Sequence, residues 1–251
     1  MPPNVGIFDL VMLAAVSAQA TTLAYLHRPR WKALVYVLPI PFTTATLALG
    51  KPVGPMHAVG LFFAVLFPFA TWWLHVRRRW PIVLSIAVAA VAYCAIGAVA
   101  NGLVPVYEFT FWLALAATFG LAAVMHCRLP HRHEPGHRSP LPVPVKFAVM
   151  IGVVSALVVL KHSLGGFMAT FPMLGVVAMY EARHSLWTLC RHVPVLMLTL
   201  APMLAVCHVA HPYLGLGGSL AAGWVVLLAG NLILLPRMWR KAACIELEQM
   251  G

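Results

Sequence analysis

Six polar or charged side chains fall within or beside long apolar runs, where they could do chemistry. They are Asp9, Lys51, Glu108, Lys161, Glu181 and Asn231. Ionisable groups at membrane depth are costly, and they mark ion or substrate pathways when they face a cavity. The carboxylates could carry a proton, the lysines could hold an anion or a proton, and the amide could bind a solute. These six residues are our candidates for substrate binding or proton coupling.

Each candidate also has a simpler structural role open to it. Asp9 lies in the first turns of its run and could reach the membrane interface, whereas Glu108 opens a run and would complement the helix dipole. Lys51 and Lys161 end their runs on the same side, and lysine side chains can snorkel to the interface. Asn231 could hydrogen-bond to a neighbouring helix. Glu181 could anchor the end of its helix by pairing with Arg183.

Histidines gather in the segment 126–137, together with one cysteine and one glutamate. Imidazole and thiolate are good ligands for zinc, copper or nickel, so His131, His133 and His137 are candidate metal ligands. Proline and arginine interrupt the segment, and it matches no known ligand spacing. A solvated linker and weak transition-metal binding both stay open, and we predict no other cofactor.

The elements that must position these residues are membrane-spanning helices. Of the 251 residues, 62% are hydrophobic and 9% are charged, and the mean hydropathy is +0.89, whereas soluble proteins carry about 25% charged residues. A span needs roughly 20 apolar residues, and lipid offers the backbone no hydrogen-bond partner, so each run should be helical. The runs are 5–26, 33–50, 56–75, 81–100, 107–126, 143–161, 164–181, 193–210 and 214–236. We therefore predict an all-α bundle of about nine spans, in which 164–181 is short and could be re-entrant.

The positive charges predict an orientation. Every one of the 17 lysines and arginines except Lys51 and Lys161 falls in alternate connections between the runs. By the positive-inside rule, this places the N-terminus outside and the C-terminus in the cytoplasm. The net charge of +11 then suits anionic lipid head groups, and nucleic acid is not an expected partner.

The chain also carries signs of an internal duplication. Four landmarks recur in order: Lys32 with Lys146, Pro81 with Pro194, Trp112 with Trp224, and Arg128 with Arg240. We predict a leading helix 1–31, a four-helix repeat 32–128, a His-rich cytoplasmic linker 129–145, a second four-helix repeat 146–241 and a tail 242–251. An even number of spans gives both repeats the same orientation.

The second repeat resembles the GlpM-like family of small bacterial membrane proteins. The resemblance rests on the runs Lys146-Phe147-Ala148, Leu164-Gly165-Gly166-Phe167 and Phe171-Pro172, with Pro194 or Pro202 as the proline of the third helix. It implies that the chain is a fused pair of such four-span units. The first repeat departs from the pattern, because its Phe67-Pro68 lies near the end of a span. The resemblance implies a fold more than an activity.

Two segments should interrupt their helices. They are Pro39-Ile40-Pro41 in the second run and Gly165-Gly166 with Phe171-Pro172 in the seventh. Transporters use broken helices to free backbone groups for their ligands, so these segments are where we expect a cavity.

The function classes follow from what the chain contains. It has no soluble catalytic motif and no connection large enough for a catalytic domain, so we do not predict an enzyme. Our first hypothesis is a permease, carrier or flippase for a small solute, an ion or a lipid-linked substrate. The alternatives are a non-transporting accessory or scaffold protein, for example in envelope polysaccharide biosynthesis, and a metal-handling membrane protein. Its partners would be the lipid bilayer and, in the accessory role, another membrane protein or a second copy of the chain.

Overall fold

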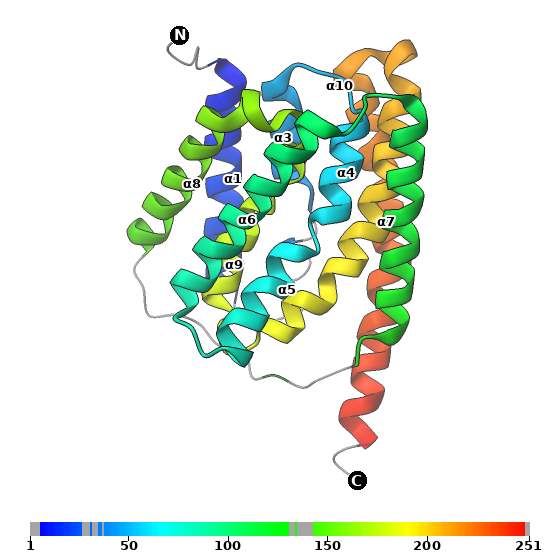
Figure 1. The fold of residues 1–251 in the computed structure, drawn as a ribbon. Helices are drawn as coiled ribbons and strands as arrows, with labels where there is room; N and C mark the ends of the chain where they lie inside the picture. The colour runs from blue at the N-terminus through cyan, green and yellow to red at the C-terminus, as the bar shows by residue number, and fades with distance from the viewer. Residues whose placement is uncertain are drawn as a thin grey trace.

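The chain folds into a bundle of helices, shown in Figure 1 as a computed structural model. The structure describes residues 6–26, 31, 35–36, 38–130, 134 and 143–248, and it contains no strand within these ranges. The helices are α1 (Ile7–Tyr25), α3 (Ile40–Leu49), α4 (Pro55–Phe63), α5 (Leu66–Trp72), the π-helix η1 (Trp73–Arg77), α6 (Ile82–Leu103), α7 (Glu108–Arg128), α8 (Val143–Leu164), the 3₁₀-helix η2 (Gly165–Thr170), α9 (Met173–Glu181) and α10 (Leu186–Glu248).

Successive elements run up and down the bundle (Figure 1). Helix α1 runs away from the N-terminal end, α3 returns to it, and α4 and α5 run away again. Helix α10 doubles back on itself at Gly215, whose φ of 66° and ψ of −175° interrupt the helix. Only glycine adopts this backbone conformation readily. Helix α10 therefore consists of a first leg before Gly215 and a second leg after it.

Four described stretches are long and apolar enough to cross a bilayer. They are Pro55–Arg77, Ile82–Leu103, Glu108–Arg128 and Leu186–Leu234, and the last one contains both legs of α10. Of the 18-residue apolar stretch in α6 only 28% is buried inside the protein, and of the corresponding stretch in α7 only 22%. Soluble proteins rarely leave such large apolar surfaces uncovered. The fold is therefore compatible with an integral membrane protein, while the number of nine spans and the repeat stay predictions.

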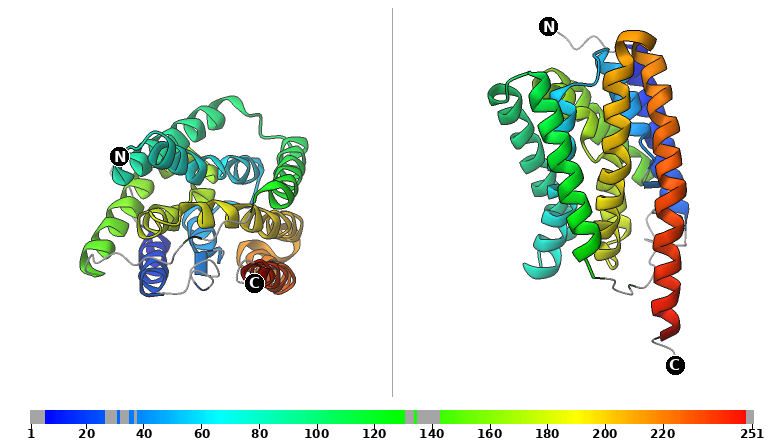
Figure 2. Two further views of the ribbon diagram at one scale, coloured as in Figure 1. Left: turned by 90° about the horizontal axis from the view of Figure 1, so that it is seen from below. Right: turned by 90° about the vertical axis from the view of Figure 1, so that its right-hand side faces the viewer.

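The first leg of α10 occupies the middle of the bundle. Seen from below, it crosses between α1 and α3 on one side and α5, α6 and α7 on the other (Figure 2). The contacts agree, because α10 packs against α7, α5 and α4, and α1 packs against α3, α8 and α9. The largest fully buried side chains include Tyr93, Phe67, Phe111 and Phe167. Phe67 lies on α5, Tyr93 on α6 and Phe167 on η2. The core therefore includes the segment beside the second predicted break.

The helices α1, α6, α7 and α8 begin and end within three residues of the predicted runs, and the remaining runs are interrupted or shifted. The run 33–50 is interrupted where Pro39-Ile40-Pro41 predicted a break, because Leu38 and Pro39 are not helical and α3 begins at Ile40. The run 164–181 forms η2 and the short α9, with Phe171 and Pro172 between them. Helix α10 begins at Leu186, seven residues before the predicted run at 193 (193 − 186 = 7).

Candidate functional site at two broken helices

Two of the predicted charged candidates lie exposed at one end of the bundle. Lys51 follows α3 and is exposed, and Glu108 is exposed as the first residue of α7. The Glu108 carboxylate accepts a hydrogen bond of 3.4 Å from Nε1 of Trp112. A carboxylate at this position complements the positive end of the helix dipole, so the structural role predicted for Glu108 is available to it.

The other candidates with described side chains are buried in separate parts of the bundle. Asp9 is 3% exposed, and its Oδ2 accepts a 2.9 Å hydrogen bond from the backbone N–H of Gly6 at the start of α1. Glu181 is fully buried as the last residue of α9. Asn231 is buried in the second leg of α10, and its Oδ1 has no hydrogen-bond partner among the described residues.

Several predicted residues lie outside what the structure describes. Lys161 belongs to α8, but its side chain is outside the described part, and so are His131, His133 and His137 entirely. Within the described ranges, no three His, Cys, Asp or Glu side chains come close enough together to hold a metal ion.

Glu134 of the His-rich linker is described, and it contacts α10. Oε2 of Glu134 accepts hydrogen bonds from the backbone N–H of Thr188 at 2.7 Å and from its hydroxyl at 2.9 Å. Oε1 accepts a third bond of 3.3 Å from the backbone N–H of Trp187, whose Nε1 donates to the carbonyl of Pro130 at 3.0 Å. Glu134 thus caps the first turn of α10, where the backbone N–H groups have no partner within the helix. At this residue the linker is attached to the bundle.

The first helix break is held open by a side chain from α1. Proline has no N–H, so Pro39 cannot donate to the carbonyl of Val35 four residues earlier. Nε2 of Gln19 donates to that carbonyl at 2.7 Å and to the carbonyl of Leu38 at 3.0 Å. The carbonyl of Val35 also accepts a longer bond of 3.3 Å from the N–H of Leu38. Gln19 is only 5% exposed, so its amide adds buried donors at the place where Pro39 has none.

The second break replaces an α-helix by a tight 3₁₀ turn. Helix η2 begins at Gly165, which has a positive φ of 52°, and it ends at Thr170, before Phe171-Pro172, where the chain is extended (φ −59° and ψ 130° at Phe171). Proline again removes a donor. Residues Phe167, Met168 and Ala169 of η2 are each at most 1% exposed, so this irregular backbone lies in the protein interior and not against lipid.

Three helices meet at a buried pair of hydroxyl groups. The hydroxyl of Tyr93 on α6 donates to the carbonyl of Gly60 on α4 at 2.9 Å and lies 3.2 Å from Oγ1 of Thr170. Thr170 in turn donates to the carbonyl of Phe167 at 3.0 Å. The two hydroxyl groups have two protons for these three contacts. When both protons are donated to the carbonyls, the hydroxyl oxygens keep acceptor lone pairs, which a further O–H or N–H donor could use.

Glycines allow the helices around η2 to approach so closely. A Cβ atom at Gly60 would lie 2.0 Å from Oγ1 of Thr170, and one at Gly97 would lie 2.4 Å from Cδ1 of Phe167. A Cβ at Gly166 would lie 2.5 Å from Nδ1 of His57. Real Cβ atoms do not approach other atoms so closely, so small residues are needed here, as is usual where membrane helices pack tightly.

His57 is a buried donor without an acceptor. The backbone N–H of Gly54 donates to its Nδ1 at 3.1 Å. An accepting Nδ1 carries no proton, so the proton of the neutral ring is on Nε2. Nε2 is buried, and no acceptor in the described part of the chain lies within hydrogen-bond distance. An unpaired buried N–H is costly, so this ring offers an unused donor beside η2.

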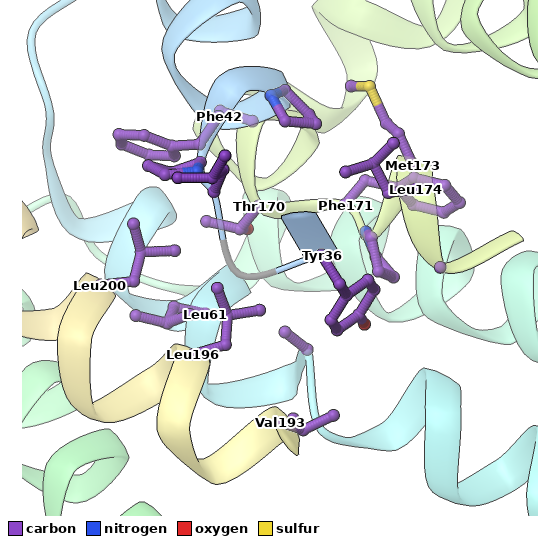
Figure 3. Close-up of a pocket in the computed structure, with 17 residues that line it drawn as sticks. Tyr36, Phe42, Leu61, Thr170, Phe171, Met173, Leu174, Val193, Leu196 and Leu200 are labelled. Carbon is purple, nitrogen blue, oxygen red and sulfur yellow. The ribbon is translucent and has the colours of Figure 1, made fainter. Parts of the chain in front are cut away.

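A small cavity lies between the two breaks (Figure 3). It measures about 60 Å³, and its wall includes Pro39 and Pro41 from the first break with Thr170, Phe171 and Pro172 from the second. This confirms the predicted location of a cavity. Its seventeen lining residues include no acidic or basic side chain, and the only side-chain hydroxyls are those of Tyr36 and Thr170. None of the five charged or amide candidates with described side chains lines it.

The described groups of the site can bind a solute. The described groups around it supply hydroxyls, backbone carbonyls and one imidazole N–H, without a nucleophile activated by a base. The sequence indicated the breaks but not His57, Tyr93 or Thr170, since nothing in a single apolar run shows which neighbouring helix it meets. The one available signal was the position of Gly60 and Gly97 within apolar runs.

Comparison with known proteins adds no relative. No family model, no curated protein and no solved structure matches the chain. The resemblance to GlpM-like units therefore stays a prediction, and the function is argued from the geometry of the site.

Proposed function

We propose that this chain is a multi-pass membrane protein that carries a small uncharged solute through the centre of its bundle. The observation that supports this most directly is that both helix breaks border one cavity. Broken helices that meet at mid-membrane are the arrangement by which many transporters hold their substrates. Thr170 is part of the cavity wall, and its Oγ1 lies 3.2 Å from the buried hydroxyl of Tyr93.

The lining supports an uncharged solute over an ion. A charged solute in an apolar site needs a counter-charge or a set of coordinating groups, and the cavity wall has no ionisable carboxylate, lysine, arginine or histidine. Thr170 instead offers an oxygen that can accept from an alcohol or amide. Apolar side chains such as Leu61 and Leu200 would contact the remainder of the solute.

Transport would require the two breaks to move apart. A cavity of about 60 Å³ holds a few water molecules at most, since each needs roughly 10–15 Å³ by this measure. Phe171 and Pro172 lie between a 3₁₀ turn and a short α-helix, so they can shift without breaking a long run of helical hydrogen bonds. In this proposal they form the gate.

The proposed setting is a bacterial inner membrane crossed nine times, with the N-terminus outside. The charge pattern supports the orientation, and the alternating direction of the elements in Figure 1 is compatible with it. A leading helix followed by two fused GlpM-like units remains our hypothesis for the origin of this arrangement.

Reconstitution tests the proposal. Proteoliposomes of the full chain are mixed with glycerol, urea and short alcohols, and the volume change is followed by stopped-flow light scattering. Ala64 lines the cavity, so Ala64→Leu should fill it and lower the rate. Ala117 is exposed on α7, so Ala117→Leu is the matched control and should leave the rate unchanged. Rates equal to those of empty liposomes for every solute would contradict the proposal.

A non-transporting accessory role is the second candidate. It is favoured by the exposure of Lys51 and Glu108, which are therefore unsuited to proton coupling through an interior path and available to a partner. Purification in mild detergent, followed by mass measurement of the intact complex, tests it. A stoichiometric membrane-protein partner together with absent solute flux would favour this role over transport.

A further inference from the structure

The turn between α5 and α6 has an unusual backbone and three consecutive arginines. Its π-helix, η1, closes with a hydrogen bond of 3.1 Å from the N–H of Arg78 to the carbonyl of Trp73. The N–H of Trp80 then donates to the carbonyl of Leu74 at 3.1 Å. Nδ1 of His75 lies 2.7 Å from the carbonyl oxygen of Trp80, and it must be the donor because a carbonyl only accepts. The turn is thus fixed by its own hydrogen bonds.

The backbone of this turn is also strained. Arg79 has a φ of 58°, and among the described residues it is the one non-glycine with a positive φ. Residues other than glycine, asparagine and aspartate rarely adopt this conformation. π-Helical turns and strained residues of this kind persist mostly at functional sites. Glycine at this position would remove the strain, so the presence of arginine suggests that its side chain is used.

The arginine charges are exposed and have no counter-charge in the protein. Arg77, Arg78 and Arg79 are all exposed. In the described ranges no carboxylate pairs with them. Cζ of Arg78 lies 4.7 Å from the ring centre of Trp73, in a cation–π contact. Three like charges on successive residues repel one another, so an external anion would stabilise this turn.

Two tryptophans place the turn at a membrane surface. Trp73 is 45% exposed and Trp80 is 40% exposed, and tryptophan is enriched where hydrocarbon meets head groups. The turn joins the ends of two stretches that are apolar enough to cross a bilayer, Pro55–Arg77 and Ile82–Leu103. The arginines therefore lie at head-group depth if these stretches are spans.

We propose that the turn Trp73–Trp80 binds the phosphate of an anionic phospholipid in the cytoplasmic leaflet. Guanidinium groups pair with phosphate oxygens through two parallel hydrogen bonds, and the exposed tryptophans would contact the upper part of the acyl chains. The excess of arginine and lysine at this end of the bundle favours the cytoplasmic leaflet. This proposal rests on the membrane placement above and not on solute transport, so failure of the flux assay leaves it standing.

Binding is measured on the full chain in mild detergent by native mass spectrometry. The probes are phosphatidylglycerol, phosphatidylcholine with the same acyl chains, and inorganic phosphate. The wild type should bind phosphatidylglycerol more tightly than phosphatidylcholine. Each Arg→Gln change in the turn should weaken phosphatidylglycerol binding about fivefold, since a basic residue near an anionic surface contributes about 1 kcal/mol. Arg128→Gln is the control, because Arg128 is exposed at the same end of the bundle. This variant should leave the difference in affinity between phosphatidylglycerol and phosphatidylcholine unchanged.

Three outcomes would overturn the proposal. The first is equal affinity for the two lipids, and the second is an equal effect of Arg78→Gln and Arg128→Gln. The third is displacement of the lipid by inorganic phosphate at comparable concentration, which would indicate a site for free anions.

A second variant separates binding from folding. Arg79→Gly removes both the strain and the charge, so it should raise or preserve the unfolding temperature while lowering the affinity for phosphatidylglycerol about fivefold. If Arg79→Gly left this affinity unchanged, the lipid would not be held by the strained residue, and the proposal would be overturned.

Discussion

Replacement of Gly60 by alanine tests whether the three elements around the hydroxyl pair are as close as the structure indicates. The new Cβ would lie 2.0 Å from Oγ1 of Thr170, 3.2 Å from Cα of Phe167 and 3.3 Å from its Cδ2. The threonine hydroxyl is also bonded to the carbonyl of Phe167, 3.0 Å away. The backbone of η2 must therefore move away from α4, and the hydrogen bond between Tyr93 and Gly60 must lengthen.

The expected loss of stability is about 2 kcal/mol. Overpacking of a core costs about 1–3 kcal/mol, and weakening one buried hydrogen bond costs about 1 kcal/mol. Alanine is favoured over glycine in a helix by about 1 kcal/mol, which offsets the lost hydrogen bond. For a chain of this length, a loss of about 2 kcal/mol corresponds to an unfolding temperature lower by about 4–8 °C.

Thermal unfolding in detergent, followed by circular dichroism, measures this shift. Thr170→Ala removes the atom that the new Cβ would strike, so Gly60→Ala should be less harmful in a Thr170→Ala background, with a coupling energy of about 1 kcal/mol or more. Gly102 on α6 has no atom within 4 Å of its virtual Cβ, so Gly102→Ala should not lower the unfolding temperature. The reasoning is refuted if Gly60→Ala unfolds at the wild-type temperature, or if its effect is the same in both backgrounds.

Three further substitutions test other contacts by the same unfolding measurement. Gln19→Leu should cost about 1–3 kcal/mol, because the carbonyl of Leu38 loses its side-chain donor and that of Val35 keeps only the 3.3 Å bond from the N–H of Leu38; an unchanged unfolding temperature would mean that the break needs no support from α1. Glu134→Gln should cost about 1–2 kcal/mol and increase hydrogen exchange at Trp187 and Thr188, since the cap loses its negative charge; unchanged exchange there would refute the cap. Tyr93→Phe keeps the ring contacts and should cost about 1–2 kcal/mol through the lost hydroxyl; a neutral result would show that the hydroxyl pair contributes nothing.

Local chemistry made part of this fold predictable. Proline lacks a donor wherever it occurs, so Pro39 and Pro172 indicated interruptions without any knowledge of their neighbours. The structure places both prolines on the wall of one cavity, although they are far apart in the chain. The helix ends near Glu108 and Pro81 were likewise close to their predicted positions.

The contacts between helices were not predictable in this way. In a soluble protein an apolar stripe marks the face of a helix that packs inward. A helix surrounded by lipid is apolar on every face, so the composition of α6 could not show that Tyr93 points inward to Gly60. Glu134 posed the same difficulty, since it meets Thr188 more than fifty residues later. Its neighbouring histidines drew attention to metal binding, whereas its carboxylate caps a helix.

The glycine turn within α10 has a consequence for how the protein is made. Between Arg191 and Arg237 the sequence contains no Asp, Glu, Lys or Arg, and Gly215 reverses the chain inside this interval. The tip of the hairpin can therefore cross the hydrocarbon without dragging an obligate charge through it. If the two legs are spans, as their length and apolar composition permit, they would enter the bilayer together as one hairpin in a single step.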